Sequence, residues 1–95
     1  MNSGNYRSRI EQKLTAALKP ILLEIKDDSA LHVGHSGHHP QGESHFSVHI
    51  VSSAFEGLPL VARHQTVYRL LASELAEHVH ALALHTLAPS DYTHR

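Results

Sequence analysis

Histidine is the residue type whose number and spacing in this chain indicate chemistry. The 95 residues include 11 histidines, which is several times the usual share. One of them, His80, stands near the start of the apolar run VHALALHT (79–86), and four others crowd together at His32, His35, His38 and His39. Imidazole titrates near pH 6.5 and binds Zn, Cu, Ni and Fe. The composition therefore indicates metal binding or a response to pH, and leaves both open.

Other kinds of site find little support in the sequence. The chain has no cysteine, so it forms no disulfide and supplies no thiolate to a metal. Ser44 and His45 are neighbours on a predicted strand, where their side chains point to opposite faces and make a poor catalytic dyad. No glycine-rich phosphate motif is present. Nine acidic residues balance eight basic ones, so net charge alone does not attract nucleic acid. We expect a binding protein and not an enzyme.

The elements that must position these histidines follow from periodicity and from turn residues. Apolar residues at helical spacing indicate helices, and alternation indicates strands. The predicted order is helix, strand, strand, helix, strand, over residues 5–19, 21–26, 45–51, 60–77 and 79–86. The glycine- and histidine-rich segment 31–44 has no periodicity, and we expect it to be a mobile loop. Residues 87–95 form a polar tail, with one short helical turn at Ser90.

The same patterns predict which side chains are buried. Pro20 ends the first helix because the residue before a proline resists helical dihedrals. Leu22 and Leu23 are expected near the core from the first strand. The apolar faces of the other elements are expected to contain Ile10, Leu14, Ala17 and Leu18 in the first helix, Phe46, Val48 and Ile50 in the second strand, and Val67, Tyr68, Leu71 and Leu75 in the second helix.

The expected position of His80 follows from the expected topology of the sheet. If a helix crosses over between strands 45–51 and 79–86 on one face of a sheet, these strands are parallel. Both then start at the edge that also holds the loop, so we expect His80 close to the loop histidines. Because His80 shares the parity of Leu82 and Leu84, we expect a partly buried imidazole at the rim of the core. It is either a metal ligand or a strand-end histidine hydrogen-bonded to a loop carbonyl.

The remaining polar residues have simpler interpretations. Asp27 and Asp28 either form the turn after the first strand or join a hard-metal site. His45 and His49 are expected to be solvated on the open face of the sheet. Arg63 and His64, near the start of the second helix, form a surface pair or bind an anion. His78 and His85 stay unassigned.

Targeting signals are not evident. No apolar run approaches the roughly 20 residues that span a bilayer. The segment MNSGNYRSRIEQKL lacks the apolar stretch of a signal peptide. We expect a single domain over residues 1–95, with an ordered core of about 5–88, in a cytoplasmic protein with no membrane contact.

Several motifs together resemble the BolA family. These are SHF at the start of the second strand, FEG in the following turn, RH at the head of the second helix and VHALAL in the last strand. RIEQKLTAALKPILLEIKDDS is similar to the family's first helix and first strand, so that the resemblance spans about residues 5–92. It implies a small α+β fold similar to a type II KH domain, in which helices cover one face of a three-stranded mixed sheet.

The resemblance also implies a function. BolA-like proteins pair with monothiol glutaredoxins, together with glutathione, and share a [2Fe–2S] cluster in iron homeostasis and cluster delivery. The implied ligands are His80 and a loop histidine, most naturally His32, with His35, His38 and His39 as rivals. A chain without thiolates cannot hold a conventional cluster alone, so we expect a monomer without a tightly bound cofactor and a heterodimer with glutaredoxin.

Two alternatives stay open. Bacterial members of the family are described as stress-linked transcription regulators that bind DNA, and Arg63, His64, Arg69 and Lys26 are the candidate contacts here. The balanced charge and the absence of the GXXG loop of KH domains count against strong DNA binding. The other alternative is a histidine-rich metal buffer that needs no partner.

Overall fold

The computed structural model describes residues 6–28 and 44–93, which form one three-stranded sheet and its helices. Their elements follow one another as α1 (Tyr6–Leu18), β1 (Leu22–Asp27), β2 (His45–Val51), the 3₁₀ turn η2 (Ser53–Phe55), α2 (Leu60–Leu70), α3 (Ala72–Glu77), β3 (Ala81–Leu87) and α4 (Pro89–Thr93). The predicted order is confirmed, and the strand predicted over 45–51 has the observed bounds.

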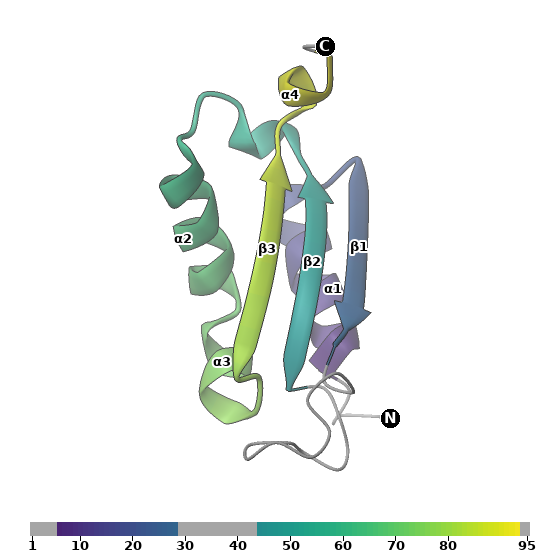
Figure 1. Ribbon diagram of the computed structural model, residues 1–95, viewed down its shortest axis with the longest axis vertical. Helices are drawn as coiled ribbons and strands as arrows, with labels where there is room; N and C mark the ends of the chain where they lie inside the picture. The colour runs from purple at the N-terminus through teal and green to yellow at the C-terminus, as the bar shows by residue number, and fades with distance from the viewer. Residues whose placement is uncertain (1–5, 29–43, 94–95) are drawn as a thin grey trace.

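The sheet has the order β1-β2-β3, with β2 in the centre (Figure 1). β1 pairs antiparallel with β2, and β2 pairs parallel with β3. The predicted parallel pairing is therefore confirmed, with His45 opposite Ala81 and Val51 opposite Leu87. A helical crossover between β2 and β3 is what a parallel pair requires.

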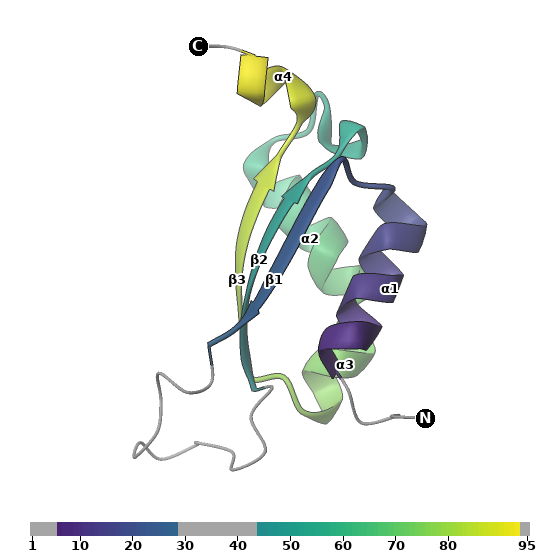
Figure 2. The ribbon, with the colours of Figure 1, turned by 90° about the vertical axis from the view of Figure 1, so that its right-hand side faces the viewer.

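The helices α1, α2 and α3 all lie against one face of the sheet, and α4 lies beyond the end of β3 (Figure 2). None of the described helices covers the opposite face. The α+β class, the mixed sheet and the helices on one face are as predicted. None of the helices among residues 6–28 and 44–93 combines the length and apolarity needed to cross a bilayer.

The core lies between the sheet and these helices. The alternation in β2 places Phe46, Val48 and Ile50 in it, and each is at most 1% exposed. The faces of the helices contribute Ile10, Leu14, Leu18, Val67 and Leu71. Burying each large apolar side chain stabilises the fold by about 1.5–3 kcal/mol.

Two residues of the predicted apolar faces are exposed. Ala17 is exposed, and exposing it costs little free energy because its side chain is a single methyl group. Tyr68 is 41% exposed, because its hydroxyl donates a hydrogen bond to the Leu82 carbonyl at the outer edge of β3. In β1, Leu23 is half-buried and packs against the core as predicted, Leu22 is half-buried, and Ile25 is the buried residue.

The second helix is also shorter than predicted. The expected helix over 60–77 is divided at Leu71, whose φ of −104° and ψ of 20° depart from helical values, so α2 and α3 are separate. The expected strand over 79–86 begins only at Ala81. His78 and Val79 still donate their amides to the Glu74 carbonyl, both at 3.0 Å, so the chain is completing α3 there.

Side chains from the helices bind carbonyl oxygens of the two edge strands. Arg7 donates to the Ile25 carbonyl on β1. On β3, Tyr68 donates to the Leu82 carbonyl and Arg63 to the Thr86 carbonyl. These bonds occupy acceptors that an added strand would need, a common protection against edge-to-edge association.

Candidate functional site

The candidate site is the corner of the sheet where β2 and β3 both begin. The amides of His80 and Ala81 donate to the Ser44 carbonyl, at 2.7 and 3.2 Å. Ser44 is the first described residue after the connection between β1 and β2, so the backbone of His80 is tied to the point where that connection enters the sheet. The predicted common edge, at which β2 and β3 both start, is confirmed, and it is the lower end of the sheet in Figure 1.

The surroundings of His80 differ from the prediction. His80 is exposed, not partly buried, and the preceding Val79 is buried at 2% exposure. The alternation of β3 starts at Ala81, so parity with Leu82 and Leu84 does not extend back to residue 80. An exposed imidazole on a backbone held by hydrogen bonds is well placed to meet a second protein.

His45 lies beside His80 at this corner. Its ring centroid lies 6.2 Å from that of His80, with the ring planes at 56°. The Ser44 hydroxyl lies 3.0 Å from His45 Nδ1, so these side chains meet, contrary to the expectation that they point to opposite faces. Ser44 precedes β2, and the alternation of a strand does not extend to it. Sequence reasoning treated His45 as merely solvated. The parallel pairing used to place His80 also brings His45, the first residue of β2, beside it. The same inference could therefore have predicted that His45 lies next to His80.

The other predicted ligands are not described. His32, His35, His38 and His39 lie outside the described residues. Among residues 6–28 and 44–93, no three His, Asp or Glu side chains converge closely enough to hold a metal ion. A metal at this corner would therefore need ligands from the connection or from another molecule.

Asp28 has a structural role at the same end of the sheet. Its amide donates to the His45 carbonyl at 2.7 Å, and its carboxylate accepts a hydrogen bond from the Ser47 hydroxyl. Asp27 is the last residue of β1, opposite Phe46. Both aspartates end the strand, in line with the turn interpretation.

A group of ion pairs fixes the segment that leads into His80. The Glu74 side chain of α3 has no exposed surface and binds Arg9 Nε at 3.1 Å and Lys13 Nζ at 2.9 Å, both from α1. Arg9 Nη1 also binds Glu77 at 2.9 Å. Because the Glu74 carbonyl accepts two amides that precede His80, anchoring α3 to α1 also sets where β3 begins.

The ion pairs change the pKa values of both glutamates. Burial alone would raise the pKa of Glu74, but the hydrogen bond from Lys13 and the charges of Lys13 and Arg9 outweigh it and hold that pKa below the ordinary 4.5. The hydrogen bond from Arg9 lowers the pKa of Glu77, and the Tyr6 hydroxyl adds a second bond. The bond to Glu77 in turn raises the pKa of Arg9.

These lowered pKa values predict acid sensitivity. A carboxylate whose pKa is lower in the folded than in the unfolded state stabilises the fold fully above the unfolded value, and the gain is lost as pH falls through the folded value. The free energy of unfolding should therefore fall below about pH 4.5 as these glutamates protonate. Denaturant unfolding between pH 7 and pH 3 measures this.

A matched pair of variants tests the origin of the acid sensitivity. Glu74→Gln should weaken the loss between pH 4.5 and pH 3, while Glu11→Gln, on the exposed side of α1, should leave it in place. An acid loss of equal size in Glu74→Gln and the unchanged protein would contradict the assignment.

The sequence of this chain matches a known protein family. A family model described as BolA-like protein matches residues 14–91. The chain belongs to the BolA family. The matched range includes His80, Ser44 and the whole connection between β1 and β2.

Two sequence relatives and one solved structure illustrate the relationship. The DNA-binding transcriptional regulator BolA of Escherichia coli is 49% identical over 80 residues, covering 84% of this chain and 72% of the relative. The chloroplastic protein BOLA1 of Arabidopsis thaliana is 45% identical over 92% of this chain, which spans only 56% of that relative's length. The BolA domain of SufE1 from Arabidopsis thaliana superposes with a TM-score of 0.83 at 42% identity, over 93% of this chain and 96% of the domain.

Three of the four candidate nucleic-acid residues of this BolA-family chain lie on α2, in different surroundings, and the fourth, Lys26, lies on β1. The Arg63 side chain is 13% exposed and donates to the carbonyls of Leu58 and Thr86 and to the Asp91 carboxylate. His64 is half-buried and Arg69 is exposed. Arg63 thus joins α2, β3 and α4 and does not form the expected surface pair with His64. The candidates presented to solvent are Arg69 and Lys26.

Proposed function

We propose that this BolA-family chain is an accessory protein that binds a monothiol glutaredoxin, with its glutathione, and shares a [2Fe–2S] cluster with it through histidine ligands. The ligands on this side would be His80 and one histidine of the β1–β2 connection, either His32 or one of its rivals His35, His38 and His39. The proposed role is iron homeostasis or cluster delivery, without enzymatic activity of its own.

One observation supports this proposal most directly. His80 offers an exposed imidazole at a corner tied by hydrogen bonds to Ser44, where the histidine-rich connection joins β2. Iron–sulfur clusters normally take thiolate ligands, and this chain has no cysteine. The donor set therefore fits one iron of a cluster whose other ligands come from a thiol-bearing partner.

The chemistry of such a cluster follows from its ligands. Histidine in place of thiolate removes negative charge from the cluster and raises its reduction potential, as in Rieske centres. The residues of this chain would orient an imidazole at the cluster and cover one side of it. Because imidazole must be deprotonated to bind metal, the shared site should weaken in mild acid.

The test is to mix the full chain with a cluster-loaded monothiol glutaredoxin and glutathione. We expect a changed visible circular dichroism spectrum and a 1:1 complex in size-exclusion chromatography. The control is the same glutaredoxin without its cluster. Two separate peaks with the glutaredoxin spectrum unchanged would contradict the proposal.

A second candidate function is DNA-binding transcription regulation. It is favoured by the relatives named as DNA-binding transcriptional regulators, one of them 49% identical to this chain. Arg69 on α2 would be a phosphate contact, whereas Arg9, Lys13 and Arg63 are already bound to carboxylates. A salt-sensitive gel shift of duplex DNA that weakens in Arg69→Gln, together with no effect on glutaredoxin, would favour this function.

A further inference from the structure

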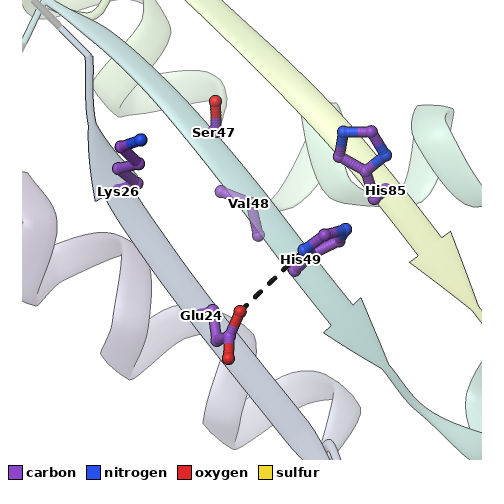
Figure 3. A pocket seen from close by; sticks show the side chains of 6 residues that line it. All are labelled: Glu24, Lys26, Ser47, Val48, His49 and His85. Atoms are coloured by element: carbon purple, nitrogen blue, oxygen red, sulfur yellow. Dashed lines mark ion pairs between the residues drawn. The ribbon is translucent and has the colours of Figure 1, made fainter.

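The open face of the sheet holds a second group of histidines, well away from His80. A hollow of about 210 Å³ lies there, and side chains from all three strands line it (Figure 3). The residues around it are Glu24, Lys26, Ser47, Val48, His49 and His85. His49 is four residues along β2 from His45, or about 13 Å at the rise of a strand, so this hollow is separate from the corner.

Two imidazoles meet in the hollow from neighbouring strands. His49 and His85 are register partners in the parallel pair. Their ring centroids are 4.4 Å apart, with the ring planes at 53°. A metal–imidazole bond is about 2.0–2.1 Å long, so two nitrogens on one ion are at most about 4 Å apart. Strands about 4.8 Å apart can present register partners at that spacing after small side-chain rotations.

Glu24 supplies the partner that a ligating histidine usually has. Its Oε1 lies 3.9 Å from Nδ1 of His49, on the side of the ring that faces β1 (Figure 3). A shift of about 1 Å in these two exposed side chains would bring the pair to hydrogen-bond distance. Histidine ligands commonly donate one ring N–H to a carboxylate, which fixes the tautomer and leaves the other nitrogen for the metal. In this arrangement Nε2 of His49 is the ligating atom and Glu24 is a positioning residue.

We propose that His49 and His85 bind one divalent transition-metal ion of the Zn²⁺, Ni²⁺ and Cu²⁺ class. Both side chains are exposed, with that of His49 at 52%, so an ion reaches them directly from solvent. No third His, Asp or Glu of the described chain completes a ligand set around an ion. Water therefore fills the remaining coordination positions, and the site is an open one.

The site is best tested by residue-resolved measurement, because the chain has other histidines that would compete for the ion. The probe is Cu²⁺ added in steps up to one equivalent to the full-length ¹⁵N-labelled chain. In this chain His32, His35, His38 and His39 are replaced by Asn to remove competing ligands. We expect paramagnetic broadening centred on the amides of Glu24, His49 and His85.

Three variants in that background decide the outcome. His49→Val keeps a good strand former on an exposed face and should abolish broadening at residues 24 and 85. Glu24→Gln should weaken Cu²⁺ binding there about tenfold, the usual effect of removing a carboxylate partner. Lys26 lines the same hollow but supplies no ligand, so Lys26→Gln should leave the broadening unchanged. Sharp lines at all three amides at one equivalent, or broadening that persists in His49→Val, would overturn the proposal.

Discussion

Replacing Arg9 and Lys13 together by methionine is expected to lower the free energy of unfolding by about 3–5 kcal/mol at pH 7. The Glu74 side chain has no exposed surface, and its two cationic partners are these residues of α1. Removing both leaves a buried carboxylate without a counter-charge. The free-energy cost of that uncompensated charge exceeds the stabilisation that the intact ion pair provides. Methionine is a good helix former, so α1 itself should not be weakened. Denaturant unfolding measures the loss.

The pH dependence of this double variant gives a second measurement. Without Arg9 and Lys13, burial dominates and raises the pKa of Glu74 above its unfolded value. Such a group destabilises the fold once pH rises above the unfolded value, so the variant should recover stability as pH falls from 7 toward 4. In the unchanged protein, Glu74 should not raise the free energy of unfolding as pH falls over that range, because its pKa lies below 4.5.

Glu74→Met is the matched control. It leaves Arg9 and Lys13 behind, but these side chains are 30% and 39% exposed and can turn to water. We expect a smaller loss than in the double variant. If the double variant lost no more stability than Glu74→Met, the buried carboxylate would not be the source of the effect.

The sequence predicted best those elements in which the spacing of apolar residues assigns the side chains to one buried face. HFSVHIV alternates over seven residues, so Phe46, Val48 and Ile50 had to share the buried side. The helical spacing of Ile10, Leu14 and Leu18 was equally clear, and all three are buried. Pro20 gave the end of α1 to within one residue, and Lys19 adopts a positive φ of 45° just before it.

The break between α2 and α3 was not predictable in this way. Val67, Leu71 and Leu75 continue the apolar spacing across it, and a burial pattern does not report a change in backbone dihedrals at Leu71. The late start of β3 has a similar origin. Val79 is apolar and buried like a strand residue, but its amide is still bound to the carbonyl of Glu74.

The candidate site was predictable in position but not in detail. The place of His80 depends on strand direction, which the helical crossover between β2 and β3 determines. Its exposure depends on the first residue of the strand, which sequence does not define closely. The Glu74 ion pairs join residues 61 and 65 positions apart, and no local pattern indicates contacts of that range.

His80→Ala is expected to abolish the circular dichroism spectrum of a cluster shared with glutaredoxin, while the fold stays intact. The hydrogen bond at the corner uses the His80 backbone amide, which alanine retains. The His80 side chain is exposed, so its removal should change the free energy of unfolding by no more than about 0.5 kcal/mol. A lost spectrum with unchanged stability would then report a lost ligand. Titration of cluster-free glutaredoxin by calorimetry separates this from lost docking, and its affinity should change little.

Two further histidine variants complete this test. His85→Ala removes the same side chain from the same strand, but on the open face, and should leave the shared cluster unchanged. His45→Ala removes the ring 6.2 Å from His80 and tests whether the neighbour is the true ligand. If His45→Ala lost the spectrum and His80→Ala kept it, the assignment of His80 would be wrong. Loss in His80→Ala alone would mean that the imidazole at the start of β3 binds the iron, because the corner backbone is the same in all three variants.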